Sequence, residues 1–214
     1  MVLLTYMGGL FKNKYRIKSA RLFGWDYGTN AYYFVTICTY KKFYYFGNVV
    51  NGKMKLSEIG EIAKQCWSNI INHFPFILLD EFIVMPNHVH GIIQINKNVP
   101  VETQHLASPE TKQISPHNSN NKTQNIASLR GRKYEKWTPN KFGPQSQNLA
   151  SVIRGFKIGV TKYTNKNNIN FQWQPRYHDS IIRNENALNG IRYYIKMNPQ
   201  KWYRDRNNNE NIWM

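Results

Sequence analysis

Acidic residues are scarce in this sequence of 214 residues, which carries 12 Asp and Glu against 29 Lys and Arg, a net charge of +17. A balance this basic argues against a neutral metabolic enzyme. Lys and Arg release condensed counterions when they neutralise phosphates, so the excess is typical of a protein that binds a polyanion. Nucleic acid is the leading partner class and an anionic membrane surface the second, while a basic surface that serves only solubility is the plain alternative.

Cysteines and long apolar runs are also nearly absent. The two cysteines, Cys38 and Cys66, form neither a disulfide framework nor a metal-binding motif. No run of 18 apolar residues exists, since Asp80 and Glu81 interrupt the best candidate. Residues 1–11 lack the basic start and the cleavage site of a signal peptide. We therefore expect a cytoplasmic protein with no membrane contact.

Apolar content is nevertheless sufficient for one folded domain. Hydrophobic residues make up 41% of the chain and aromatic residues 14%. The length predicts a single domain that carries an insertion or a tail. We expect this domain at residues 16–203, with an N-terminal leader at 1–15 and a tail at 204–214, bounds that follow the family resemblance described below. Residues 97–147 are dominated by Asn, Gln, Ser, Thr and Pro and cannot bury enough apolar area to fold alone. We expect this segment to be a mobile insertion in the domain.

The order of the predicted elements indicates an α+β fold. Runs of β-branched and aromatic residues predict strands, and apolar residues at helical spacing predict helices. The predicted strands cover residues 31–40, 77–85 and 89–95, with a strand or loop within 171–184, and the predicted helices cover 56–74, 149–165 and 185–197. Pro86 and Asn87 predict a turn or bulge, and Pro199 ends the last helix. We therefore expect an antiparallel sheet with helices on one face.

Two histidines in an apolar strand form the sharpest local feature. His88 and His90 are two residues apart, so their side chains project from one face of the strand while Val89 packs on the other. Both imidazoles can then reach one divalent ion. Histidines in strands are more often satisfied by hydrogen bonds than by metals. The preceding turn favours the metal interpretation, because such devices commonly orient functional side chains.

A second feature lies in the last predicted helix. Tyr194 and Asn198 are four residues apart and share a helical face, so the Asn198 carbonyl oxygen can reach the same ion as the tyrosine. A tyrosine with an ordinary pKa near 10 is a nucleophile only where the developing charge is stabilised, and a divalent ion does this by polarising a phosphate. The plain alternative is that Tyr193 and Tyr194 are amphipathic core residues.

Several blocks in a fixed order resemble a known family. They include MPNHVHG and the late Tyr-x-x-x-Asn-Pro, and they read GWDYGTNAYYFVTICTY, LSEIGEIAKQCW, EFIVMPNHVHGIIQI, LASVIRGFKIGVTKY and YHDSIIRNENALNGIRYYIKMNPQKW. Together they resemble the REP-associated tyrosine transposases, a branch of the IS200-like single-tyrosine HUH transposases. The resemblance covers about residues 16–96 and 148–203.

This resemblance implies a ferredoxin-like HUH nuclease that acts on single-stranded DNA, at hairpins formed by palindromic repeats. Tyr194 would attack a backbone phosphate, form a 5′-phosphotyrosine and leave a free 3′-hydroxyl that allows later rejoining. His88, His90 and Asn198 would hold Mg²⁺ or Mn²⁺. Relatives include both monomers and homodimers, and the sequence does not decide between them. The alternative is a non-catalytic module of the same fold that binds single-stranded nucleic acid.

Basic and aromatic residues in the second half of the chain are candidate DNA contacts. Cations neutralise the backbone and aromatic rings stack on unpaired bases. The candidates are Lys157, Lys162, Trp173, Arg176, Tyr177, Arg183, Arg192 and Lys196. For each one taken alone, a solvated surface position or core packing is an equally ordinary explanation. A metal hydrolase of small phosphoesters is a weaker hypothesis, because the sequence has no further acidic cluster near the histidines and such an enzyme does not explain the charge.

Overall fold

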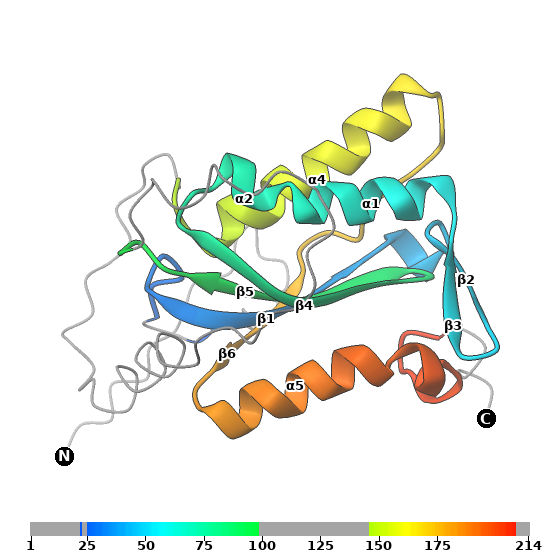
Figure 1. Cartoon of the computed structure of the whole chain (residues 1–214). Coiled ribbons are helices and arrows are strands. Elements are labelled where there is room, and N and C mark those ends of the chain that lie inside the picture. The colour runs from blue at the N-terminus through cyan, green and yellow to red at the C-terminus, as the bar shows by residue number, and fades with distance from the viewer. Residues whose placement is uncertain (1–21, 23–24, 99–145, 209–214) are drawn as a thin grey trace, which may run out of the picture.

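A four-stranded antiparallel sheet forms the centre of the computed structural model, which describes Leu22, residues 25–98 and residues 146–208 (Figure 1). The predicted leader, residues 99–145 of the predicted insertion and residues 209–214 of the tail lie outside the described residues. The elements run β1 (Ala31–Cys38), η2 (Tyr40–Lys42), β2 (Gly47–Val50), β3 (Lys53–Leu56), α1 (Glu58–Ser68), α2 (Ile70–His73), β4 (Ile77–Met85), β5 (His88–Ile95), α4 (Leu149–Lys166), β6 (His178–Ile182), α5 (Glu185–Met197) and η4 (Pro199–Arg204).

The strand order of the sheet is β4-β5-β1-β6, and β2 pairs with β3 in a separate hairpin. Together with α1 between β1 and β4, and α4 between β5 and β6, this order is the ferredoxin-like arrangement. The predicted α+β class with an antiparallel sheet is confirmed. The predicted helix at 56–74 is divided at Asn69 into α1 and α2, while the last predicted helix has the bounds of α5.

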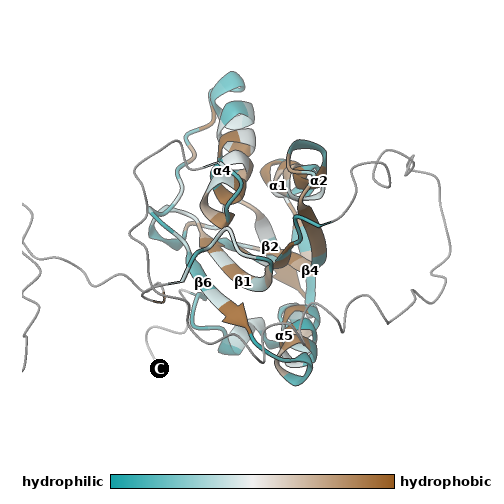
Figure 2. Cartoon of the chain, turned by 90° about the vertical axis from the view of Figure 1, so that its left-hand side faces the viewer, coloured by the Kyte–Doolittle hydropathy of each residue, from teal (hydrophilic) through white to brown (hydrophobic). Residues whose placement is uncertain are grey.

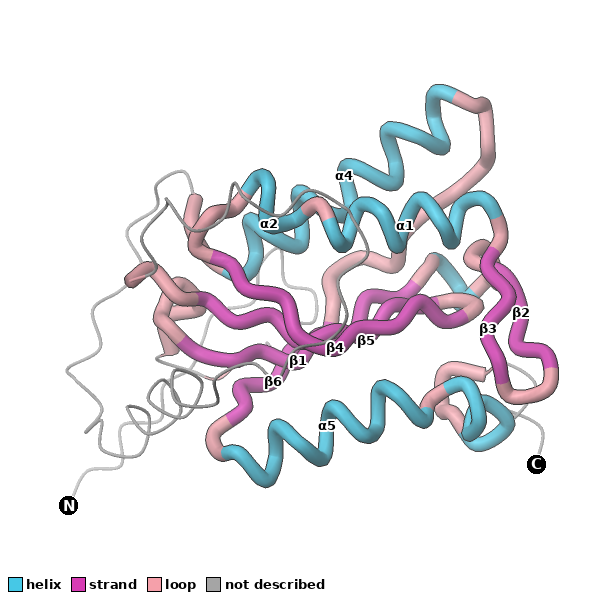
Figure 3. Tube along the Cα trace, in the orientation of Figure 1, coloured by secondary structure: helices cyan, strands magenta, loops and turns pink. Residues whose placement is uncertain are grey.

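The helices cover both faces of the sheet, so the expectation of helices on one face is wrong for α5. Helices α1, α2 and α4 lie on one side of the strands and α5 on the other (Figures 1 and 3), and the brown apolar strands lie between the two helical layers (Figure 2). The physical reason is that β1 and β5 bury side chains on both of their faces. Tyr33 and Val35 belong to the α1 and α4 core, whereas Tyr32 and Ile92 pack with Leu188 of α5. A strand buried on both sides needs cover on both sides.

One glycine sets the fit between α1 and β5. A Cβ on Gly91 would lie 2.1 Å from Cζ2 of Trp67, which is fully buried against this strand. Only glycine lets the indole approach so closely. Gly91 follows His90 directly, so this packing and the histidines lie on opposite faces of the same strand.

Candidate metal centre and tyrosine site

His88 and His90 lie side by side on the face of β5 that α5 covers. Their ring centroids are 4.4 Å apart, and both side chains are buried. Phe34 of β1 stacks on His90, with the ring centroids 5.3 Å apart. The alternation predicted from the spacing is present: Val89 between them belongs to the core under α1 and α4.

Hydrogen bonds orient each imidazole. Nδ1 of His88 lies 2.8 Å from Oδ1 of Asn87, which can only accept, so the ring proton is on Nδ1. This leaves the lone pair on Nε2 of His88 buried, with no hydrogen-bond partner among the described residues. His90 places Nδ1 2.9 Å from Oγ1 of Thr36 and Nε2 3.1 Å from the hydroxyl of Tyr194. Nδ1 of each ring is thus held by a neighbouring side chain, which leaves Nε2 as the atom that can bind a metal, and hydrogen bonds of this kind orient metal-binding histidines.

Asn198 and Asp205 complete the cluster from the chain that follows α5. Asn198 caps α5, and its Nδ2 donates to Oδ2 of Asp205 over 3.1 Å. Oδ1 of Asn198 is buried without a hydrogen-bond partner in the described part of the chain. One ligand atom from each of His88, His90 and Asp205 lies within 4.8 Å of the others. Two imidazole nitrogens, a carboxylate and the amide oxygen of Asn198 are four donor atoms that fit a divalent cation, and two of them, Nε2 of His88 and Oδ1 of Asn198, are unpaired among the described residues.

Burial controls the protonation of the site. It is the main reason that the pKa of His90 falls from 6.5 to about 4, with Asp205 acting in the opposite direction. Burial and then the neighbouring His90 hold the pKa of His88 well below 6.5. The pKa of Tyr194 is raised, first by burial and then by the charge of Asp205. Near neutral pH both histidines are therefore uncharged and able to bind metal, and the tyrosine hydroxyl keeps its proton.

Asn87 connects the site to two loops. Its Nδ2 donates to the carbonyl oxygens of Lys42 (3.1 Å) and Asn207 (2.7 Å), while its Oδ1 orients His88. Lys42 has a positive φ of 55°, an uncommon conformation for a residue with a Cβ. Strained backbone of this kind persists where the surroundings over-determine it, often at functional sites. Asn87 thus links the strained turn, the first histidine and the segment that carries Asp205.

Sequence reasoning did not single out Asp205 or Asn87. Asp205 lies in the segment assigned to the tail, where the polar run RDRNNN gives no periodic signal. Trp202, which is 9% exposed, was the available clue, because a tryptophan in a polar segment buries a large apolar area when it packs against the fold. Asn87 sits in the turn that was predicted, but only the fold shows which groups its amide bonds.

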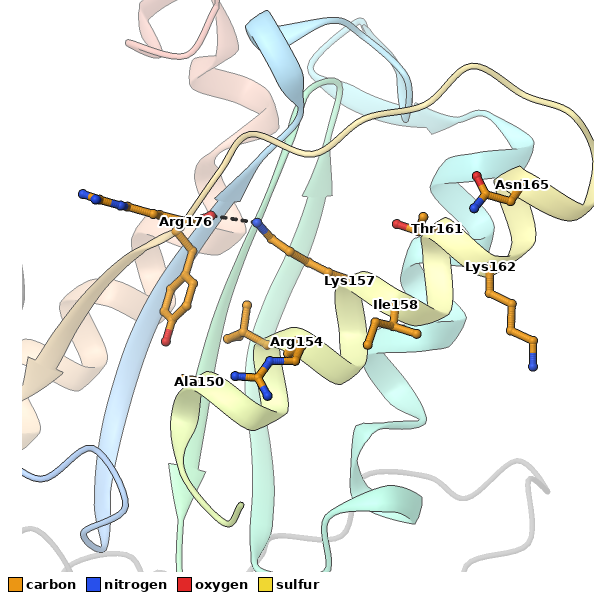
Figure 4. Close-up of a pocket in the computed structure, with 10 residues that line it drawn as sticks. Ala150, Arg154, Lys157, Ile158, Thr161, Lys162, Asn165 and Arg176 are labelled. Atoms are coloured by element: carbon orange, nitrogen blue, oxygen red, sulfur yellow. Dashed lines mark hydrogen bonds between the residues drawn. The ribbon is translucent and has the colours of Figure 1, made fainter. Parts of the chain in front are cut away.

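Four of the eight candidate DNA contacts lie together in a groove beside α4. The groove has a volume of about 640 Å³ and is lined by Lys157, Lys162, Arg176 and Tyr177 among others (Figure 4). Lys157 is half-buried, and burial lowers its pKa to about 8. Its ammonium donates to the carbonyl oxygens of Gln174 and Arg176, so it holds this loop. The groove is formed by α4, which covers the sheet face opposite to α5 and Tyr194 (Figure 1).

The other four candidates are dispersed. Trp173 packs with the aromatic core and donates its indole N–H to the carbonyl oxygen of Lys157. Arg183 is exposed between β6 and α5. Arg192 and Lys196 are engaged in ion pairs with Asp80 and Glu81.

In the described ranges, no helix is long and apolar enough to cross a membrane.

Comparisons with known proteins identify a bacterial relative of this chain. The chain is 36% identical over 196 residues to an uncharacterized protein of Haemophilus influenzae, a match that covers 88% of this chain and 91% of that protein. No family model matches the sequence. A solved structure of a REP-associated tyrosine transposase bound to a REP hairpin is similar over 81% of this chain and 68% of that chain, with 15% identity and a TM-score of 0.46.

Proposed function

This chain belongs to the family of the Haemophilus influenzae protein, and from its own site we propose that it is a metal-dependent nuclease and strand transferase for single-stranded DNA. One observation carries the proposal. The hydroxyl of Tyr194 lies 3.1 Å from Nε2 of His90, beside the unpaired Nε2 of His88 and the carboxylate of Asp205. A nucleophile therefore adjoins a set of metal ligands.

His88, His90 and Asp205 would hold the divalent ion, with the side-chain oxygen of Asn198 as a further ligand. Mg²⁺ and Mn²⁺ accept oxygen ligands, and the two imidazoles favour Mn²⁺ of the pair. When bound, such an ion acts as a Lewis acid on a non-bridging oxygen of the scissile phosphate. The low pKa of His90, about 4, keeps its ring available as a ligand across the physiological pH range.

Tyr194 supplies the nucleophile. Its hydroxyl gives up a proton as its oxygen bonds to the phosphorus; the bond between phosphorus and the 3′-oxygen breaks, and that oxygen takes up a proton. The products are a 5′-phosphotyrosine and a free 3′-hydroxyl. Attack of another 3′-hydroxyl on the phosphotyrosine reverses the step and joins two strands. Because the covalent bond conserves the energy of the phosphodiester, no nucleotide cofactor is needed.

The substrate follows from charge and from the resemblance of the sequence. The net charge of +17 fits a polyanion, and the groove beside α4 offers cations together with Tyr177. The blocks that resemble REP-associated tyrosine transposases lead us to hairpins of palindromic repeats as the substrate. Arg176 and Lys162 are the proposed backbone contacts in the groove, whereas Lys157 organises its wall.

The test is formation of a covalent adduct. Labelled single-stranded oligonucleotides from the DNA that flanks the gene are incubated with protein and Mn²⁺, Mg²⁺ or EDTA, then separated under denaturing conditions. We expect an adduct that requires metal and disappears in Tyr194→Phe. Tyr193→Phe is the matched control, because Tyr193 is adjacent but 58% exposed, and it should keep the adduct. DNA binding without any adduct in either metal would instead establish a non-catalytic binding module.

A further inference from the structure

An irregularity in β4 turns two consecutive carboxylates toward α5. The pairing of β4 with β5 shifts between Leu79 and Phe82, so β4 has one extra residue there. Leu79 and Phe82 both pack against the core under α1 and α4. Asp80 and Glu81 between them both reach residues of α5. In a regular strand neighbouring side chains alternate between faces, so the bulge is what places both carboxylates on one side.

The two carboxylates meet two cations one helical turn apart. Asp80 accepts from Nε of Arg192 over 2.9 Å and from Nη2 over 2.6 Å, a bidentate pair with side chains only 9% and 19% exposed. Glu81 lies 2.8 Å from Nζ of Lys196, and this pair is more exposed. Bidentate pairs shielded from water are strong and directional, whereas exposed pairs contribute little. Asp80 therefore provides most of the constraint.

These pairs flank Tyr194 in the sequence and lie on the opposite side of the helix from it. Residues that are two positions apart in a helix point about 200° away from each other around its axis. Tyr194 therefore projects away from both Arg192 and Lys196. Leu188 and Ile195 face the sheet between the two sides. Apolar contacts are not directional and by themselves would leave the rotation of the helix weakly fixed, whereas directional ion pairs on one side would oppose a rotation. A roll of about 10° moves a side-chain tip by about 1 Å.

The geometry points to Asp80 and Glu81 as positioning residues for the nucleophile: the bulge carboxylates fix the rotation of α5 and so hold the Tyr194 hydroxyl against His90. This inference rests on the proposed role of Tyr194 as nucleophile. It also gives Arg192 and Lys196 a role other than contact with DNA. A misplacement of about 1 Å can lower a rate 100-fold, so the effect on cleavage is expected to be large.

The test compares Asp80→Asn and Glu81→Gln with Glu61→Gln, which removes an exposed carboxylate from α1 on the other side of the sheet. At saturating Mn²⁺ and DNA, Asp80→Asn should slow adduct formation about 10- to 100-fold. Glu81→Gln should slow it less than about threefold, and Glu61→Gln should leave it unchanged. DNA affinity, measured in a Tyr194→Phe background, should not change in any of them.

A double-mutant cycle separates positioning from DNA contact. If Arg192 acts through Asp80, the variant Asp80→Asn with Arg192→Gln should be no slower than the slower single variant. Additive losses, with a fall in DNA affinity for Arg192→Gln, would overturn the inference. Hydrogen exchange of α5 amides, measured without metal or DNA, adds a readout independent of activity. It should accelerate in Asp80→Asn while α1 is unaffected, and unchanged exchange would also overturn the inference.

The same set distinguishes the two levels of the argument. A wild-type protein that forms no adduct, yet shows faster α5 exchange in Asp80→Asn, would refute the proposed nuclease and the role of Asp80 in its chemistry, while the ion pair would still be shown to hold α5. An adduct of normal rate in a folded Asp80→Asn variant would retain the nuclease and refute the positioning role.

Discussion

On one face of the sheet α1 and α4 close over an apolar core, and on the other a single helix carries the candidate chemistry. Among the described residues, the first core contains 20 buried hydrophobic residues and the second contains 5. The second face buries His88, His90, Asn198 and Asp205 instead. The difference indicates that the two faces have different roles. The face under α1 and α4 supplies most of the apolar stabilisation, whereas the face under α5 holds buried polar groups in place by hydrogen bonds and ion pairs.

Of the substitutions that distinguish the two faces, those at the histidines are expected to have the largest effect on metal affinity and adduct formation. His88→Ala removes a metal ligand but little apolar packing, so metal affinity and adduct formation should fall more than about 100-fold while the fold persists. Calorimetric titration with Mn²⁺ and circular dichroism measure the two quantities. Asn87→Ala, which keeps every ligand but removes the partner of His88 and the amide that bonds the carbonyls of Lys42 and Asn207, should lower metal affinity by about 10- to 100-fold. Equal loss in both variants would contradict the proposed ligand role of His88.

Trp67→Ala should destabilise the apolar core under α1 and α4 without affecting the site on the other face. Trp67 is fully buried against Gly91, and its truncation should lower the free energy of unfolding by about 3–5 kcal/mol. At a temperature where the variant is still folded, its Mn²⁺ affinity should match that of the wild type. Chemical denaturation and titration together check this prediction. A parallel loss of metal affinity would show that the two faces are not independent.

Acid should weaken the site face through the buried histidines. The pKa of His90 is 6.5 in the unfolded chain, whereas burial lowers this pKa to about 4 in the folded chain. Between these two pH values the unfolded state binds more protons than the folded state. The free energy of unfolding therefore decreases as the pH is lowered from 6.5 to about 4, by about 3 kcal/mol for this group. His88 acts in the same direction. Denaturation in EDTA should show this slope, and His90→Gln should reduce it; an equal slope in the variant would assign the effect elsewhere.

Mixing two inactive variants should have the smallest effect, namely none. Tyr194 lies against His90 of its own chain, because α5 packs on its own sheet. A mixture of Tyr194→Phe with His90→Ala should therefore regain no adduct. Recovery in the mixture would mean that α5 is exchanged between chains, and that the in-chain contact is only one of two arrangements.

Local sequence signals predicted the parts of the site that periodicity controls. The two-residue spacing of His88 and His90 placed both on one strand face, and the four-residue spacing of Tyr194 and Asn198 placed both on one helical face. That this helix faces the histidines was an expectation that the family resemblance supported, and the contact between Tyr194 and His90 agrees with it. Strand alternation and helix periodicity are short-range, so they can be read from one segment. The antiparallel α+β class followed from the order of the same segments.

Contacts between distant segments were beyond that reach. Asp205 comes to the histidines only because Trp202 is buried and Asn87 binds the carbonyl of Asn207, a pair 120 residues apart. The bulge in β4 depends on pairing with β5, and nothing in the run LLDEF announces it. The second helical layer was also missed, although the almost continuous apolar run of β1, AYYFVTIC, already indicates a strand that is buried on both faces.

The measurement that tests the central claim most directly is the chemical identity of the protein–DNA bond. After reaction with Mn²⁺, the adduct is digested with nuclease and protease, and the modified peptide is sequenced by mass spectrometry. The account predicts a nucleotide phosphate on the hydroxyl of Tyr194 and on no other residue. A phosphate on Tyr193 or on another side chain, or cleavage without a covalent adduct, would contradict it.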